Sequence, residues 1–405
     1  MVLHESPMSD SLITLHRITN HSMIRDSAAF ISGLFVPQRD LFFKKGGVIL
    51  RIDGTNITFT AADSHFLKKF GLIEAGEMVM NFKSLNDLPF IYDTYQLADF
   101  LFLRRKSMFS IFKSDKNRFY EKVSLKKKNG GVRIINAPDE LMKSIQRRIN
   151  YEIVSKLPVS EYATAYKSGC NLKNNADKHI GKKYLLKMDI TDFFGSIRFE
   201  QVYSSVFNTK YFPKQIGVIL TSFCCLNDVL PQGAPTSPGI SNLVLKNFDD
   251  NIGAWCKARG ITYTRYCDDL TFSSDNSLYH VYVKVEKMLE DMGFEINKKK
   301  THFVTSATRQ TVTGLTVNEK VTVSKEYKRK LRQEIYYILK YGAADSLIHA
   351  GADDCIRHGT ISVTKYLDII IGKTNYVLSI EPENEYFKKS LYKLRSIRSG
   401  YSYDN

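Results

Sequence analysis

Two adjacent aspartates, Asp268 and Asp269, stand in the stretch RYCDDLTF, between segments rich in Tyr, Thr, Leu and Phe. A third carboxylate, Asp189, ends another apolar run in YLLKMDITDFF. Both runs have the pattern of buried strands, so neighbouring strands of one sheet could bring the three side chains together. Two ionised carboxylates ~4 Å apart repel each other by roughly 1 to 4 kcal/mol, and the cluster would therefore need a compensating cation.

An all-oxygen group of this kind suits Mg²⁺, with Mn²⁺ as an alternative ion. Two such ions about 3.5 to 4 Å apart can activate a 3′-hydroxyl and stabilise a departing pyrophosphate during in-line phosphoryl transfer. Aspartates are also common in the turns of solvated hairpins, where they have no catalytic role. The three carboxylates alone leave both nucleotidyl transfer and a plain turn open.

The composition is that of a globular and basic protein. The 405 residues are 43% hydrophobic, and 58 Lys and Arg against 42 Asp and Glu give a net charge of +16. This charge favours a polyanionic partner, either nucleic acid or an anionic membrane surface. No stretch approaches ~20 apolar residues and the first residues lack a signal-peptide pattern, so we expect a cytoplasmic protein without a membrane partner. The six cysteines form no CxxC pairs, which argues against a zinc site or a disulfide framework.

The chain divides into three segments of different texture. Residues 1–91 hold short β-like runs and are expected to form a small accessory region. Residues 92–322 mix helical and strand patterns: two helices flank a hairpin in KKKNGGVRIINAP, and an irregular turn in LPQGAPTSP precedes a further helix near Ser237. Residues 323–405 are mainly helical and basic, as expected of a domain that grips a duplex through its phosphates. The sequence therefore predicts an α+β fold.

Several segments resemble, in the family's order, the reverse transcriptases, and most closely the bacterial retron type. YCDD fits the YxDD box, DITDFF the first carboxylate motif, LPQGAPTSP the template and nucleotide motif, and GFEINKKKT the segment after YxDD. KKKNGGVRIINAP with LMKSIQRRI is similar to the fingers, and NNADKH and QTVTGLTVN to the NAxxH and VTG signatures of retron enzymes. The resemblance implies a right-hand polymerase, with fingers and palm in residues 92–322, a helical thumb in residues 323–405, and the accessory region before them.

The resemblance also implies roles for individual residues. Asp189, Asp268 and Asp269 would be catalytic and would bind two Mg²⁺ or Mn²⁺ ions, with the Ile190 carbonyl as a further ligand. Phe194 stands where the family has a steric gate against ribose 2′-hydroxyls. The other expected nucleotide-binding residues are Lys127, Arg133, Asp192 and Gln232. The expected template or RNA contacts are Gly233, Asn175, His179, Val312, Thr313 and Gly314. One of Lys298, Lys299 and Lys300 would neutralise or protonate pyrophosphate.

The implied function is RNA-directed DNA synthesis in antiphage defence. The enzyme would copy a cognate structured noncoding RNA from dNTPs into an RNA–DNA duplex, with a protein effector as a further partner. Residues 1–91 have no counterpart in the core family pattern, and YATAYKSG has Tyr166 where Phe is common. These departures leave open a related defence-associated reverse transcriptase that makes unbranched or repetitive cDNA. Two rival interpretations are less favoured. A non-catalytic RNA-binding protein would gain nothing from a repulsive carboxylate cluster, and a signalling nucleotidyl cyclase does not explain LPQGAPTSP or the basic thumb.

Overall fold

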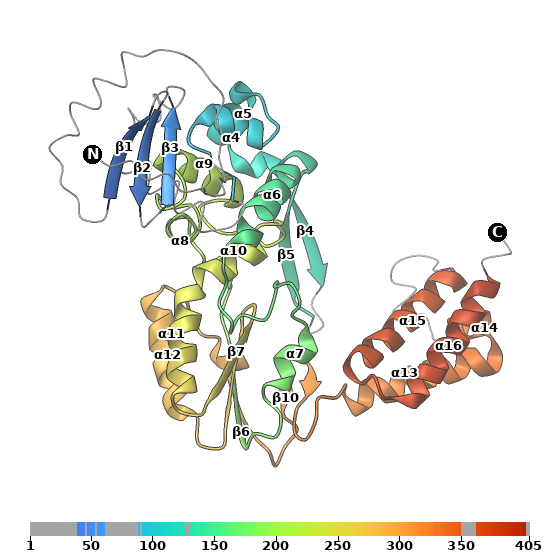
Figure 1. Cartoon of the computed structure of the whole chain (residues 1–405). Coiled ribbons are helices and arrows are strands. Elements are labelled where there is room, and N and C mark those ends of the chain that lie inside the picture. Colours follow the sequence, from blue (N-terminus) through green and yellow to red (C-terminus); the bar gives the residue numbers. More distant parts are fainter. Residues whose placement is uncertain are drawn as a thin grey trace, which may run out of the picture. The chain divides into compact units, whose positions relative to one another are not determined.

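The computed structural model describes residues 39–44, 47–52, 55–60, 88–89, 91–126, 130–349 and 362–401, with the backbone alone for the first three ranges and for 348–349. The chain forms two compact units (Figure 1). The first unit holds residues 1–158 and 197–244, and the second holds residues 159–196 and 245–405. Residues 92–322 contribute to both units, and the segment boundaries expected from the sequence stay predictions.

The N-terminal part of the first unit contains an antiparallel sheet in the order β1-β2-β3. Its strands are β1 (Arg39–Lys44), β2 (Gly47–Ile52) and β3 (Thr55–Thr60). Only two residues separate consecutive strands in the sequence, and the register pairs Lys44 with Gly47 and Ile52 with Thr55. Such short loops fix antiparallel hairpins, which explains why the β-like runs of this region pair with their sequence neighbours.

The rest of the first unit is a group of helices with one hairpin. Helix α6 shows why they form: Asp139 caps its first turn by accepting from the Met142 amide at 2.8 Å, and Met142, Ile145 and Ile149 line its buried face. The helices are α4 (Thr94–Phe100), α5 (Arg105–Lys113), α6 (Glu140–Glu152), α8 (Phe199–Ser205), α9 (Lys214–Cys224) and α10 (Ser237–Val244), with short 3₁₀ helices at Lys116–Phe119 and Val154–Lys156.

The expected hairpin in KKKNGGVRIINAP is present, formed by β4 (Tyr120–Lys126) and β5 (Val132–Pro138). Its outer end is exposed on both strands. The irregular LPQGAPTSP segment then leads into α10, which begins at Ser237 as predicted, and the Ser237 hydroxyl donates to the Pro231 carbonyl at 2.8 Å. This bond fixes the turn because it ties both ends of the segment together.

The second unit is built on an antiparallel sheet in the order β7-β8-β6-β9. The strands are β6 (Tyr184–Asp189), β7 (Thr262–Tyr266), β8 (Asp269–Ser274) and β9 (His302–Thr305). The central strands are apolar because their side chains are buried, with Leu186, Leu270 and Phe272 fully enclosed. Tyr263 and Phe272 are register partners whose rings stack at 4.7 Å.

Smaller elements surround this sheet. Helix α11 packs against β7, and the predicted amphipathic helix in VYVKVEKMLEDMGF is α12, with Val281, Val285 and Leu289 on its buried face. The elements are α7 (Leu172–Asp177), α11 (Lys246–Lys257), α12 (Tyr279–Asp291), a 3₁₀ helix at Lys298–Lys300, and the small hairpin of β10 (Thr311–Val312) and β11 (Leu315–Thr316).

The C-terminal residues of the second unit are helical and basic, as the sequence predicts. The helices are α13 (Lys325–Tyr341), α14 (Ala343–His349), α15 (Val363–Ile380) and α16 (Glu385–Gly400). Ile335, Ile370 and Phe387 meet in an apolar cluster that also includes Leu185 of β6 and Val312 of β10, so the helices share a core with the sheet. In the described ranges no helix has the length and apolarity needed to cross a membrane.

Candidate active site

The three carboxylates lie at one end of the four-stranded sheet. Asp189 is the last residue of β6 and Asp269 the first of β8, and the antiparallel register places them directly opposite each other. Asp268 lies in the two-residue loop that joins β7 to β8, and its carbonyl accepts from the Ile190 amide at 3.1 Å. The sheet therefore brings together carboxylates that are about 80 residues apart in the sequence.

Burial and mutual repulsion raise the pKa of Asp269 to about 6. Desolvation is the largest cause, followed by the negative charges of Asp268 and Asp189. A lysine partly compensates the negative charge of the site. The Lys300 ammonium donates to both carboxylate oxygens of Asp189, at 2.9 and 2.8 Å. The pKa of Lys300 rises because of this bond and the nearby Asp268 and Asp269. The structure thus distinguishes the two lysines: Lys300 contacts the carboxylate of Asp189, whereas the ammonium of Lys298 lies 3.4 Å from Glu286.

The donor set fits a hard divalent cation in its chemistry. Asp189, Asp268 and Asp269 offer only carboxylate oxygens, and the contact with Lys300 shows that positive charge is attracted to this place. Within the described residues no three His, Cys, Asp or Glu side chains converge on one point closely enough to hold an ion. Lys300 engages Asp189 in this state, so an ion that took Asp189 as a ligand would have to displace the ammonium.

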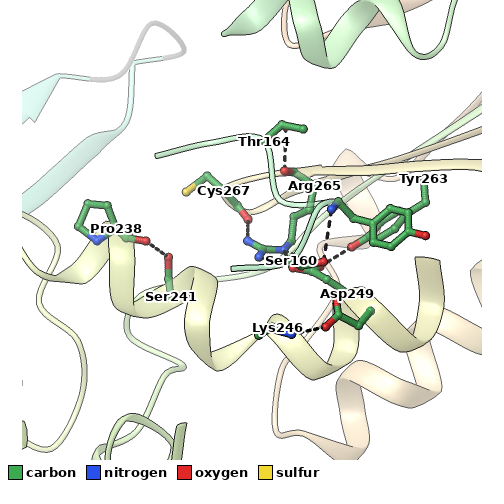
Figure 2. Close-up of polar contacts among 11 residues, drawn as sticks. Ser160, Thr164, Pro238, Ser241, Lys246, Asp249, Tyr263, Arg265 and Cys267 are labelled. Carbon is green, nitrogen blue, oxygen red and sulfur yellow. Dashed lines mark hydrogen bonds and ion pairs between the residues drawn. The ribbon is translucent and has the colours of Figure 1, made fainter. Parts of the chain in front are cut away.

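The loop between β7 and β8 has a strained backbone that a buried ion pair supports (Figure 2). Cys267 has a φ of 61°, in the left-handed region that disfavours a residue with a Cβ atom. Its carbonyl accepts from Nη1 of Arg265 at 3.0 Å, and Arg265 also pairs with Asp249 of α11. The sequence motifs did not indicate this pair; its only signals were a charged residue inside a buried strand and an aspartate on the apolar face of a helix.

The predicted nucleotide-binding residues of the second unit follow directly after Asp189. Asp192 is exposed with a φ of 41°, Phe193 is buried, and Phe194 is partly exposed. One of the two phenylalanines is thus a core residue, and Phe194 keeps the exposure that a steric gate needs. A Cβ atom on Gly195 would lie 2.3 Å from Oδ2 of Asp192, so glycine is required for the present position of that carboxylate.

The predicted nucleotide-binding residues of the first unit lie on its hairpin and its irregular turn. Arg133 is exposed on β5, and Lys127 lies outside the described residues. The carbonyl of Gln232 accepts from the Asn136 amide of β5 at 2.8 Å. Gly233 has a φ of 125°, and a Cβ atom there would lie 2.6 Å from Cγ2 of Ile135. The backbone of Gly233 thus lies close to β5. Its contact with a template stays a prediction.

The NAxxH residues are internal, contrary to the prediction that they contact RNA. His179 is fully buried: Nδ1 lies 2.7 Å from the Ser273 hydroxyl and Nε2 lies 2.8 Å from the Thr264 hydroxyl. Asn175 is also buried, and its Oδ1 accepts from the Thr164 hydroxyl at 3.0 Å. Burial lowers the pKa of His179 to about 3, so the ring is neutral. These side chains tie α7 and its flank to β7 and β8 and present no surface to a template.

The VTG residues form the tight turn between β10 and β11. Val312 is fully buried in the core, so the expected RNA contact is wrong for its side chain. Thr313 and Gly314 both have positive φ angles, 46° and 84°, as in the type I′ turns of two-residue hairpins. Gly314 is exposed, and RNA contact by Thr313 and Gly314 stays a prediction.

Comparisons with known proteins agree with the geometry. A family model described as reverse transcriptase (RNA-dependent DNA polymerase) matches residues 125–325. Retron Mx65 reverse transcriptase of Myxococcus xanthus is 35% identical over 238 residues, 54% of this chain and 56% of that protein. Retron Ec83 reverse transcriptase of Escherichia coli is 33% identical over 243 residues, 56% of this chain and 78% of that protein.

These similarities are partial in length. The chain spans about half of the Myxococcus xanthus relative, and the family-model match over residues 125–325 includes the sheet with its three carboxylates. Among solved structures, apo telomerase from Candida tropicalis aligns with a TM-score of 0.42 and 12% identity, over 85% of this chain and 68% of that one. This structural alignment is too distant to add anything to the sequence matches.

Replacing Asp269 with Asn should stabilise the protein in the absence of divalent ions. The folded-state pKa of about 6 exceeds the ordinary value of 3.8, so the ionised side chain destabilises the fold fully above pH 6 and not at all below about pH 4. We expect Asp269→Asn to add on the order of 1 kcal/mol at pH 8, and nothing at pH 4. Urea denaturation in EDTA at both pH values measures this difference; equal stability of both proteins at pH 8 would contradict it.

Replacing His179 with Gln should cost on the order of 1 to 3 kcal/mol at pH 7, because at least one buried hydroxyl loses its partner. The folded pKa of about 3 lies below the ordinary 6.5, so the contribution of His179 is complete above pH 6.5 and falls as the pH decreases toward 3. The gap between wild type and variant should therefore narrow from pH 7 to pH 5 in urea denaturation. His280→Gln, an exposed change on α12, is the control. A gap that is constant with pH would show that His179 is not held neutral.

Proposed function

Because the chain belongs to the retron-type reverse transcriptases, we propose that it is an RNA-directed DNA polymerase whose active site is the carboxylate end of the four-stranded sheet. The observation that carries this proposal is the register of Asp189 opposite Asp269, with Asp268 in the adjoining loop and Lys300 bound to Asp189. The family match over residues 125–325 includes all four positions. A plain solvated turn would not account for buried Asp189 facing a second carboxylate and paired with a lysine.

The residues of the site divide the work of nucleotidyl transfer. Asp189, Asp268 and Asp269, with the Ile190 carbonyl, would hold two Mg²⁺ ions, or Mn²⁺ in their place. Bound divalent ions supply charge neutralisation to the 3′-hydroxyl and to the departing pyrophosphate. Lys300 keeps the carboxylates compensated in the free protein. Once released from Asp189, its ammonium can donate a hydrogen bond or a proton to the pyrophosphate. The sequence predicted this role for one of Lys298, Lys299 and Lys300.

Asp192, Phe194, Arg133, Gln232 and Lys127 are proposed to bind the incoming dNTP. Support for Arg133 is its exposure on β5, because an exposed guanidinium can bind triphosphate oxygens with two hydrogen bonds. Support for Phe194 is that its ring is only partly packed. A ring left accessible at this point could exclude a ribose 2′-hydroxyl, which favours deoxynucleotides.

The template partner is proposed to be a cognate structured RNA, held as an RNA–DNA duplex by the basic C-terminal helices. Helices α13 and α16 combine buried apolar residues with exposed basic and aromatic ones, and the Lys340 ammonium lies 4.9 Å from the ring centroid of Tyr341. The exposed Lys and Arg side chains suit phosphates and the exposed Tyr rings suit bases. The exposed Lys, Arg and Tyr residues of these helices are Lys325, Arg329, Lys330, Arg332, Lys340, Lys388, Lys389, Lys393, Arg395, Tyr336, Tyr337, Tyr341, Tyr386 and Tyr392.

A retron role in antiphage defence, with a protein effector, is the finer proposal, and the similarity to retron enzymes supports it. The second candidate is a defence-associated reverse transcriptase that makes unbranched or repetitive cDNA. This candidate stays open because Tyr166 stands where the family commonly has Phe; the side chain is exposed, and its hydroxyl donates to the sulfur of Cys267 at 3.3 Å. Sequencing the nucleic acid that copurifies with the protein separates the two: a 2′-branched RNA–DNA supports the retron and unbranched cDNA the second candidate.

The double replacement of Asp268 and Asp269 by Asn should abolish dNTP incorporation, because the amides cannot neutralise a cation. Binding to RNA should change little, since phosphate contacts come from basic side chains. Primer extension on an RNA template and a mobility-shift titration measure the two properties. Asp275→Asn, an exposed carboxylate paired with Lys182 beyond β8, is the matched control and should extend primers normally. Full activity of the double variant would refute the proposed site.

Replacing Gly195 with Ala should weaken dNTP binding while the fold remains intact. The new methyl group would force the Asp192 carboxylate to turn away, because the present distance would be 2.3 Å. We expect KM for dNTP to rise several-fold, with a smaller change in kcat and in thermal stability. Gly372→Ala, at a helical glycine with open space around it, controls for the added methyl group. An unchanged KM would show that the Asp192 side chain is not needed for nucleotide binding.

A further inference from the structure

The geometry points to the buried Arg265–Asp249 ion pair as the device that positions the loop carrying Asp268. This inference rests on the proposed function, because positioning has a meaning only if that loop holds active-site carboxylates. Arg265 and Asp249 would not touch substrate or metal; they would act through the backbone of Cys267. Neither residue belongs to the motifs that identify the site.

The ion pair is completely enclosed within the second unit (Figure 2). Nε of Arg265 lies 2.9 Å from Oδ1 and 3.1 Å from Oδ2 of Asp249, and Nη2 also donates to Oδ2. The Tyr263 hydroxyl donates to Oδ1 of the same carboxylate at 2.8 Å. Both side chains have no exposed surface. Asp249 is thus saturated with donors, and the guanidinium is locked in one orientation.

The locked guanidinium has one nitrogen left, and that nitrogen reaches the loop. Nη1 of Arg265 donates to the carbonyl of Cys267 at 3.0 Å (Figure 2). The backbone of Arg265 is itself fixed, because its amide donates to the Tyr162 carbonyl at 2.9 Å and its carbonyl accepts from the Thr164 amide at 2.8 Å. The side chain therefore connects a rigid strand and helix α11 to the residue immediately before Asp268.

The loop needs this support because Cys267 adopts a left-handed backbone. Its φ of 61° costs on the order of 1 to 3 kcal/mol for a residue with a side chain, and such a conformation persists only where the surroundings determine it. The next residue, Asp268, uses its carbonyl to accept from the amide of Ile190, which directly follows β6, so the loop backbone also sets this link. A released Cys267 carbonyl would let both Asp268 and this link shift.

Stability alone is a weak reason for such a pair. A buried ion pair can often be replaced by apolar residues of similar volume without loss of stability, while removal of one partner is strongly destabilising. This asymmetry provides the test, since an apolar double replacement can restore packing and cannot restore the hydrogen bond to Cys267. Lys at position 265 keeps the charge, but one ammonium group lacks the planar fork that serves Asp249 and Cys267 together.

The test compares Arg265→Lys, the double variant Arg265→Met with Asp249→Leu, and Val285→Ala. Val285 is a fully buried residue of α12, so its truncation should lower stability at a position outside the loop. Three quantities are measured on the full chain: Mn²⁺ affinity by electron paramagnetic resonance, kcat and KM in primer extension, and hydrogen exchange of the peptides that contain Ile190 and Cys267. Thermal melting places all variants on one stability scale.

We expect Arg265→Lys to bind Mn²⁺ about tenfold more weakly and to lose about 100-fold in kcat, with KM for dNTP little changed. Exchange of the Ile190 amide should accelerate. The double variant leaves the buried Tyr263 hydroxyl without its acceptor, so it should melt below the wild-type temperature, and it should show the same losses as Arg265→Lys. Val285→Ala should also melt lower, but with normal kcat, Mn²⁺ affinity and exchange. Wild-type kcat and Mn²⁺ affinity in either Arg265 variant would overturn the inference.

The outcome separates this inference from the proposed function. A wild-type chain that neither binds Mn²⁺ nor extends primers refutes the proposed function, and the exchange of the Ile190 amide still reports whether Arg265 holds the loop. If the double variant does not fold, Arg265→Lys alone decides: unchanged exchange and kcat reject positioning, and accelerated exchange with reduced kcat supports it.

Discussion

Mutual repulsion of carboxylates at one sheet end is the constraint on which the rest of the structure depends. Asp189 and Asp269 face each other because β6 and β8 are register partners, and their charges remain close even when no substrate is present. Lys300 offsets part of this charge by donating to both carboxylate oxygens of Asp189.

The surroundings of the sheet restrict how these charges can relax. Buried His179 joins β7 to β8 through two hydroxyls, and the apolar cluster joins β6 to the C-terminal helices. Strand positions are thus set by packing, whereas the loop at Cys267 has an irregular backbone that relies on Arg265 for its support. The rigid parts are held by many contacts and the reactive part by few, which is common at sites that trade stability for function.

Much of this arrangement was predictable from the sequence, because strand and helix patterns are local. Apolar runs that end in Asp189 and Asp269 indicated buried strands, and the period of α13 indicated a basic helix. Lys300 could not be chosen among three consecutive lysines, since a short 3₁₀ turn sends neighbouring side chains in different directions. The prediction for His179 was wrong because a sequence motif does not show whether a polar side chain is exposed to RNA or buried against hydroxyl groups. The partner of Arg265 is on a separate helix, and no local pattern records such a pairing.

Because Gly233 has no side chain, its backbone can lie directly against the hairpin of the first unit. Its backbone lies against Ile135 and Asn136, and the neighbouring Gln232 accepts the Asn136 amide, so the irregular turn and strand β5 are in contact with no space between them. A movement of the exposed hairpin end that carries Arg133 would therefore also move Gln232, because β5 and the irregular turn are in direct contact. A ligand that pulled on one of these two polar groups would reposition the other.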